Sequence, residues 1–356
     1  MRSIFKRSLL TLAGAAVLGL AGPAPSSAVE TITVTSWGGA YSMSQRKAFH
    51  EPYAKETGIT VLEDEWQGTV GSIRGQVDTG NYKWHVIDSE RDMVILGCDE
   101  GFLEPIPWDM MGGEDAFVEG WTEECGVPTI TWSTIYAYDA DVYPDSGAHP
   151  TTLADFFDVE KFPGKRGVGN FPKPNLEWAL LADGVAMDQI YVLLETDAGV
   201  QRALDKFDSI RDHIVWWSAG AQPPQLLADG EVVMTSAWNG RIYNAIKSEG
   251  KNFRIVWDAQ GLELDYWIVP KGHPEKQAAF EYIAYTVQPE VMANQSKYIS
   301  YGPTVKAAVA LINDEILKDL PTAPGNTKNV LNVDIAFWTD RREELNERWN
   351  AWQAQD

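Results

Sequence analysis

Positive charge, cysteine and long apolar stretches are all scarce in this chain. It has 29 Lys and Arg against 51 Asp and Glu, a formal net charge of −22. Nucleic acids and other phosphate-bearing partners would therefore be repelled. One apolar run covers residues 9–21, which is shorter than the about 20 residues that cross a membrane. We expect a protein that binds no nucleic acid and contains no membrane span.

Motifs for catalysis and metal binding are also missing. The sequence contains no HExxH motif, nucleophile elbow or phosphate-binding loop, and the glycine series at residues 68–75 lacks the strand-to-loop context of one. The five histidines follow no metal-ligand or general-base spacing: His50, His85, His149, His213 and His273. We expect no enzyme activity, no metal and no cofactor. An exported hydrolase that uses a carboxylate pair such as Asp88 and Glu90 is the remaining enzymatic alternative.

The first residues have the pattern of a secretory leader. Arg2, Lys6 and Arg7 precede the apolar run, which is followed by the small residues Pro25-Ser26-Ser27-Ala28. This predicts a signal peptide over residues 1–28, cut after Ala28, and export to the periplasm. No cysteine lies near the cleavage site, so we expect a freely diffusing protein without a lipid anchor.

The chain contains two cysteines, Cys98 and Cys125, and both follow the predicted cleavage site. Paired thiols persist in the oxidising space outside the cytoplasm. We therefore predict one disulfide between them, with two separate buried thiols as the alternative.

Strand-like and helix-like segments alternate along the chain, which predicts an α/β fold. In the first third, strands are expected at 31–35, 59–65 and 84–87, and helices at 44–57, from about 70, and at 92–100. Such a βαβαβ order requires a mostly parallel sheet. Further strands are expected at 129–138, 232–237 and 264–270, and helices at 197–212, from 239, at 274–286 and at 338–353. The length and this repetition favour two α/β lobes.

Ligands of open parallel sheets bind beyond the carboxyl ends of the strands. That rule selects Trp37 and Tyr41 after the first strand, Asp88, Ser89 and Glu90 after the third, and residues 238–241 after a later one. Aromatic residues and carboxylates alternate in several of these segments, as an ammonium-binding site requires. Strand alternation also sends Glu263 and Asp265 to one face, where a buried pair would need a compensating cation.

Several segments resemble the extracellular solute-binding proteins of ABC importers, specifically the spermidine/putrescine-binding group. The matching segments are residues 35–41, 84–90, 100–106, 127–136, 151–165, 237–240, 264–266 and 301–304. The resemblance implies the type II periplasmic-binding-protein fold, in which two lobes joined by crossing strands close on a ligand. We place the first lobe at 29–138 plus 261–306 and the second at 139–260 plus 307–356.

The resemblance also implies roles for single residues and partners. It assigns the ligand wall to Trp37 with Tyr41 beside it, first-lobe contacts to Ser89 and Glu90, a second-lobe carboxylate to Glu177, stacking to Trp238, an ammonium partner to Asp265, and the cleft mouth to Tyr301. The implied partners are a small amine and an inner-membrane permease, and the implied receptor acts as a monomer. A chemosensory module with the same ligand site is an alternative.

Two residues depart from the polyamine-binding pattern. Glu263 stands where relatives place a tryptophan, and Arg241 stands where polyamine binders carry a small polar residue. A guanidinium in the cleft would repel an amine but hold a carboxylate through two hydrogen bonds. We expect a polyamine such as putrescine or spermidine as ligand, with a zwitterion such as 4-aminobutyrate as the alternative. In a third interpretation Arg241 faces solvent or pairs with a neighbouring acid.

Overall fold

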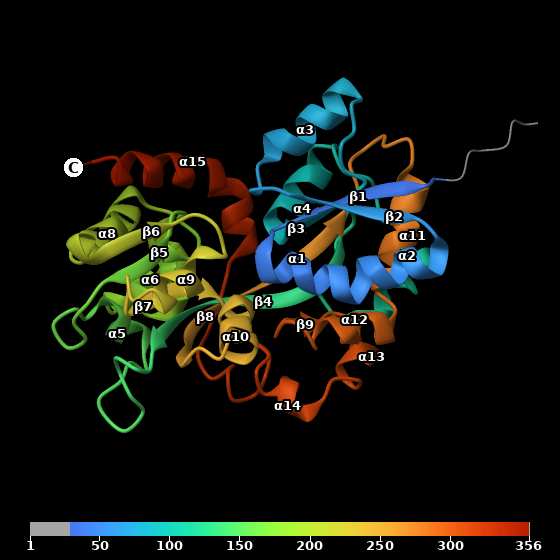
Figure 1. Ribbon diagram of the computed structural model, residues 1–356. Coiled ribbons are helices and arrows are strands. Elements are labelled where there is room, and N and C mark those ends of the chain that lie inside the picture. Colours follow the sequence, from blue (N-terminus) through green and yellow to red (C-terminus); the bar gives the residue numbers. More distant parts are fainter. Residues whose placement is uncertain (1–28, 356) are drawn as a thin grey trace, which may run out of the picture.

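The computed structural model describes residues 29–355 (Figure 1). The predicted signal peptide, residues 1–28, lies outside the described residues. No helix within residues 29–355 is both long and apolar enough to cross a membrane.

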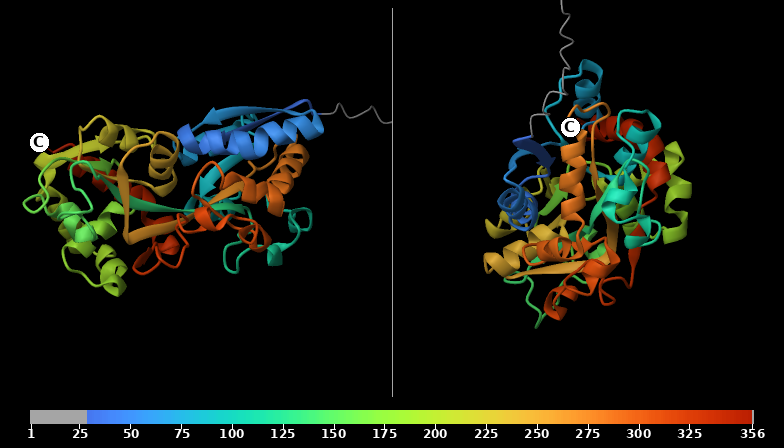
Figure 2. Two further views of the ribbon diagram at one scale, coloured as in Figure 1. Left: turned by 60° about the horizontal axis from the view of Figure 1, so that its bottom comes forward. Right: turned by 90° about the vertical axis from the view of Figure 1, so that its right-hand side faces the viewer.

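Two sets of parallel strands define two lobes, which lie side by side in the elongated molecule (Figures 1 and 2). The first lobe contains β1 (Thr31–Ser36), β2 (Thr60–Glu65) and β3 (Val86–Glu90), in the order β2-β1-β3. The second contains β5 (Arg166–Gly169), β6 (Ile214–Trp217) and β7 (Met234–Trp238), in the order β7-β5-β6. The inner strands β3 and β5 are buried along nearly their whole length, whereas β2, at the edge of the sheet, is largely exposed.

Two long strands connect the lobes. β4 (Val127–Asp139) and β8 (Phe253–Ile268) pair with each other in antiparallel fashion, and each also pairs with a strand of one lobe, β8 with β3 and β4 with β7. The β4–β8 ladder has two register shifts, one between Pro128 and Ile130 and one between Thr134 and Tyr136. Two short strands complete the sheet at its margins, β9 (Gly302–Pro303) on β4 and β10 (Val330–Asn332) on β8.

Helices cover both lobes. In the first lobe they are α1 (Gly39–Gln45), a π-helical turn (Arg46–His50), α2 (Glu51–Thr57), α3 (Val70–Thr79), α4 (Arg91–Asp99), α11 (Lys276–Thr286), α12 (Pro289–Gln295), α13 (Lys306–Val309) and α14 (Asp314–Leu317). In the second they are α5 (Leu153–Phe157), α6 (Asn175–Ala182), α7 (Ile190–Leu194), α8 (Asp197–Asp208), α9 (Gln222–Ala228), α10 (Asn239–Ser248) and α15 (Ile335–Gln353).

The third strand differs from the prediction in a way that matters for the site. It runs from Val86 to Glu90 rather than over 84–87. Its start is delayed because the Trp84 amide donates to the side chain of Gln76, at 3.1 Å, instead of to a neighbouring strand. Its end is extended because residues 87–90 pair with β8. Asp88 and Glu90 therefore lie within the strand and not in the loop after it.

Each lobe has its own apolar core. The largest core cluster of the second lobe includes Trp178 and Trp349, and that of the first lobe includes Phe49 and Trp267. The first-lobe cluster also contains Ala308, Ile312 and Leu320. These three side chains, from α13 and the segments after α13 and α14, pack on the first-lobe core although they follow residue 306, where we predicted that lobe to end.

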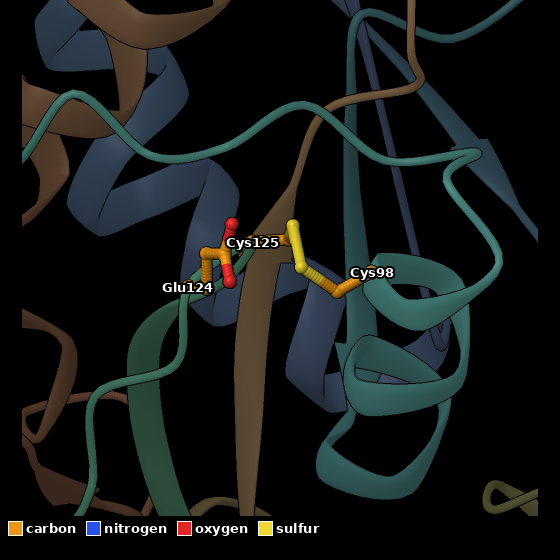
Figure 3. A group of neighbouring side chains, drawn as sticks. All are labelled: Cys98, Glu124 and Cys125. Atoms are coloured by element: carbon orange, nitrogen blue, oxygen red, sulfur yellow. A yellow bond between two sulfur atoms is a disulfide. The ribbon is translucent and has the colours of Figure 1, made fainter.

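A disulfide joins Cys98, in α4, to Cys125, just before β4 (Figure 3). Their Cα atoms are 5.6 Å apart, within the range that a disulfide spans. The bond therefore ties a surface helix of the first lobe to the strand that leaves that lobe.

Candidate ligand-binding site

A small cavity lies where the two lobes meet. It contains about 290 Å³ of empty space, part of it open to solvent, and is lined by eight residues: Trp37, Tyr41, Glu90, Trp132, Trp238, Arg241, Asp265 and Tyr301. The first lobe supplies Trp37, Tyr41 and Glu90, and the second supplies Trp238 and Arg241 from the junction of β7 and α10. The cavity is therefore complete only when the two lobes are together.

The sequence predicted seven of these eight residues. The eighth, Trp132, lies in the crossing strand β4. Its indole nitrogen donates to Oδ1 of Asp265 at 2.7 Å. Trp132 occurs in one of the segments that resemble the family, but nothing local to it indicated a contact with the carboxylate, which comes from 133 residues further along the chain.

Two glycines allow the first lobe to approach the second closely. Gly38 and Gly39 have φ angles of 71° and 58°, which are unfavourable for residues with a side chain. A Cβ atom on Gly39 would lie 2.7 Å from Nη1 of Arg241. The Trp37-Gly38-Gly39 turn thus leaves room for the guanidinium at the start of α1.

Two buried aspartates form the anionic wall of the cavity. Asp265 lines it, and Asp88 lies one layer behind, where it accepts hydrogen bonds from Trp37 Nε1 at 3.2 Å and Gln45 Nε2 at 2.5 Å. Burial raises the pKa of Asp88 to about 6. Burial, followed by the charges of Asp88 and Glu90, raises the pKa of Asp265 well above its ordinary value. The pair is therefore poised to share a proton or to accept a cation.

The cationic wall is the guanidinium of Arg241. Its Nη1 donates to the main-chain oxygen of Gly38 and its Nη2 to that of Trp37, both at 3.0 Å. The guanidinium carbon also lies 5.1 Å from the centroid of the Trp238 ring. The side chain is buried, and burial lowers its pKa. Arg241 thus neither faces solvent nor pairs with an acid, and its Nε has no partner among the described residues.

Aromatic rings hold Trp238 in place. Phe171 stacks parallel to it, with ring centroids 6.3 Å apart, and Trp217 and Trp132 contact it edge-on at 5.7 and 6.0 Å. On the other side of the cavity Tyr41 and Tyr301 pack at 5.2 Å. These rings restrict the orientation of Trp238 and give the cavity apolar walls around Glu90, Arg241 and Asp265.

A cluster of charged residues lies outward from the cavity, in a larger part of the interlobe cleft. Lys173 of the second lobe contacts three carboxylates, with Nζ 2.6 Å from Glu263 Oε2, 3.0 Å from Glu90 Oε2 and 3.6 Å from Asp92 Oδ1. Arg342 in α15 contacts Glu90 and Asp92 at 2.5 Å each. These ion pairs cross from one lobe to the other. Neither Lys173 nor Arg342 was predicted, because no local motif indicates them.

Four predicted ligand contacts lie outside the cavity. Asp88 lies behind Trp37, which lines the cavity and donates a hydrogen bond to it. Ser89 points to the opposite face of β3 because side chains alternate along a strand, and it is completely buried. Glu177 in α6 is buried beneath α15, where it accepts hydrogen bonds from Trp338 Nε1 at 2.6 Å and from the Tyr191 hydroxyl at 3.1 Å. Glu263 lines the outer cleft instead of the inner cavity.

One group of neighbouring side chains among residues 29–355 has the composition of a metal site. It consists of Cys98, Glu124 and Cys125 (Figure 3). Both sulfur atoms are joined in the disulfide, so neither is a thiolate, the form in which cysteine binds metals. This group is therefore structural.

Comparison with known proteins identifies the family. A family model described as bacterial extracellular solute-binding protein matches residues 48–325. The gamma-aminobutyric acid-binding protein of Pseudomonas aeruginosa is 42% identical over 325 residues, which cover 91% of each chain. The putrescine-binding periplasmic protein PotF of Escherichia coli is 27% identical over 97 residues, 25% of this chain and 26% of that protein.

A solved structure supports the same assignment. The Atu4243–GABA receptor is 32% identical, with a TM-score of 0.80, and the match covers 92% of this chain and 98% of that one. This similarity confirms the predicted two-lobed α/β fold of periplasmic binding proteins. The chain belongs to the family of bacterial extracellular solute-binding proteins, which in ABC importers bind a small solute and a membrane permease.

Proposed function

We propose that this protein captures a small ω-amino acid such as 4-aminobutyrate between its lobes and delivers it to the permease of an ABC importer. The observation that carries the proposal is the presence of one buried cation, Arg241, and one buried carboxyl, Asp265, on the walls of the same small cavity. Such a cavity complements a molecule with a carboxylate at one end and an ammonium at the other.

Charge balance in the cavity favours a zwitterion over a polyamine. Before a ligand enters, Arg241 carries one positive charge, and burial together with mutual repulsion favours a single negative charge on the Asp88–Asp265 pair. A zwitterion adds no net charge to this buried site. A diamine adds two positive charges beside a buried guanidinium, and burial of uncompensated charge is costly.

The other carboxylates of the cleft are already paired with cations of the protein. Glu90 and Glu263, which we expected to bind ammonium groups, contact Lys173 at 3.0 and 2.6 Å, and Glu90 also contacts Arg342. Our expectation of a polyamine is therefore less well supported than its alternative. The similarity to two proteins whose names state that they bind GABA supports the same choice, whereas the putrescine-binding relative matches over a quarter of the chain.

A hydrolase mechanism on Asp88 and Glu90 lacks support. Asp88 is completely buried behind Trp37, and Glu90 is held in ion pairs with two cations. Neither carboxylate is free to protonate a leaving group or to activate water. We propose a receptor without catalytic activity that acts as a monomer in the periplasm.

Ligand binding and lobe closure are expected to be one equilibrium. A ligand stabilises the closed form through contacts that exist only when both walls are present, and here Asp265 and Arg241 come from opposite sides of the cavity. Calorimetric titration of the purified protein with 4-aminobutyrate, putrescine and spermidine tests the proposal. We expect 4-aminobutyrate to bind most tightly, and tight binding of putrescine alone would contradict it.

A further inference from the structure

The position of Lys173 suggests a role in ligand selection, which rests on the proposed function. Its Nζ contacts Glu263, Glu90 and Asp92. Glu90 also lines the inner cavity, and the inner cavity and the outer cleft share Trp37, Trp132 and Trp238 as walls. Lys173 is therefore a built-in cation on the outward side of the ligand cavity, in contact with a residue that lines it.

The sheet register places a second anionic position in line with the first. Glu90 on β3 lies opposite Asp265 on β8, and Glu263 follows on the same face of β8, about 7 Å away along the strand. A four-carbon diamine can span that separation, with one ammonium on Asp265 and the other near Glu263 and Glu90. In this structure the second position already holds the ammonium of Lys173.

Several features hold Lys173 there. Its side chain is 9% exposed, and the residue lies between Pro172 and Pro174, which restrict the backbone. Although burial lowers the pKa of Lys173, the charges of Asp92, Glu263 and Glu90 raise it above its ordinary value. The lysine is thus charged at any physiological pH.

We infer that Lys173 is a specificity-determining residue: its ammonium takes the place that the second ammonium of a diamine would occupy, and so restricts the site to ligands with a single ammonium. A diamine would either face Lys173 as a like charge or have to displace it from three carboxylates, and like charges in direct contact are strongly unfavourable. A monoamine carboxylate meets neither obstacle.

The test is to measure the putrescine and 4-aminobutyrate affinities of wild-type protein and of Lys173→Gln by calorimetry. We expect putrescine affinity to rise at least about tenfold in Lys173→Gln, because Glu263 becomes available while Arg342 still holds Glu90. The double variant Lys173→Gln/Glu263→Gln should lose most of that gain. Lys173→Arg, which keeps the charge, should retain the wild-type preference.

Lys161→Gln is the matched control. Lys161 lies in the same lobe, pairs with a carboxylate, Asp155, at 2.7 Å and does not line the cleft, so putrescine affinity should not change. If thermal unfolding shows that Lys173→Gln does not fold, Lys173→Met, which keeps the apolar stem, takes its place. An unchanged or lower putrescine affinity in the folded variant overturns the inference.

The two proposals fail separately. Wild-type protein that does not bind 4-aminobutyrate overturns the proposed function. The Lys173 inference is still decided by putrescine alone, since a gain of binding in the variant supports it and no gain overturns it.

Discussion

The guanidinium of Arg241, on the second lobe, donates a hydrogen bond to the main-chain oxygen of Trp37, on the first lobe, at 3.0 Å. The same group also lines the ligand cavity. A ligand carboxylate that binds Arg241 therefore attaches to a group that already bridges the lobes, and this couples recognition to closure.

The first prediction concerns Arg241→Gln. Loss of the guanidinium should weaken 4-aminobutyrate binding by about 2–5 kcal/mol, because the ligand carboxylate would lose a buried charged partner. Calorimetry measures the change. Arg202→Gln is the control, since Arg202 is 46% exposed and pairs with Asp183 away from the cleft. Equal losses in both variants would contradict the assignment.

The second prediction concerns Asp265→Asn. The amide keeps the shape of the carboxyl and can still accept from Trp132, but it cannot pair with an ammonium. Affinity for 4-aminobutyrate should fall by about 2–5 kcal/mol while the circular dichroism spectrum stays that of the wild type. Asp229→Asn, an exposed aspartate bonded to Gln225, provides the control. Unchanged affinity in Asp265→Asn would rule out its role.

The third prediction is a pH dependence that originates at Asp88. Tyr41, Gln45, Trp37 and Asp265 face this carboxyl, and burial raises its pKa to about 6. The unliganded fold thus holds a proton that the unfolded chain releases at lower pH, and its contribution to stability is lost as pH rises through about 6. An ammonium ligand pairs with the ionised form, so its affinity should increase over the same range.

Thermal unfolding with and without 4-aminobutyrate at about pH 5 and pH 7.5 checks this sign. The ligand-induced rise in Tm should be larger at the higher pH, and Asp88→Asn should flatten the difference. Glu177 is an internal reference: burial raises its pKa to about 7, but it lies away from the cavity and should alter stability equally with and without ligand. A ligand effect that is larger at the lower pH would refute the prediction.

The fourth prediction concerns the disulfide. It closes a loop with a sequence separation of 27, so its removal should cost about 3–4 kcal/mol of unfolding free energy on the chain-entropy estimate. Denaturant unfolding of Cys98→Ala/Cys125→Ala measures this cost. Ligand affinity should be nearly unchanged, because neither residue lines the cavity. The native protein should also resist thiol alkylation unless it is reduced, and ready alkylation would argue against the bond.

Local patterns predicted the fold and much of the cavity wall. Strand alternation and the rule that ligands bind beyond strand ends selected Trp37, Tyr41, Glu90 and Asp265, and the junction of β7 with α10 selected Trp238 and Arg241 together. These residues could be found because each lies in or shortly after a strand whose pattern is visible in the sequence.

Contacts between distant segments were not predictable. Lys173 and Arg342 are more than 160 positions apart, yet both contact Glu90. The resemblance implied that Glu177 is a second-lobe ligand carboxylate, but helix α15 covers it and Trp338 donates a hydrogen bond to it. Whether a carboxylate contacts a ligand or a lysine depends on how distant segments pack together. Local patterns in a single sequence do not show that packing.

The register shifts in the β4–β8 ladder bear on how the lobes would separate. The antiparallel pair β4–β8 connects the two lobes. Separation of the lobes would therefore have to bend or twist these paired strands. The two register shifts are the places where the pair can deform while few hydrogen bonds break. Amide protons of the regular ladder should then exchange slowly in either state, with faster exchange confined to those steps. The lobes would then separate by bending of this strand pair, and not as two bodies joined by flexible linkers.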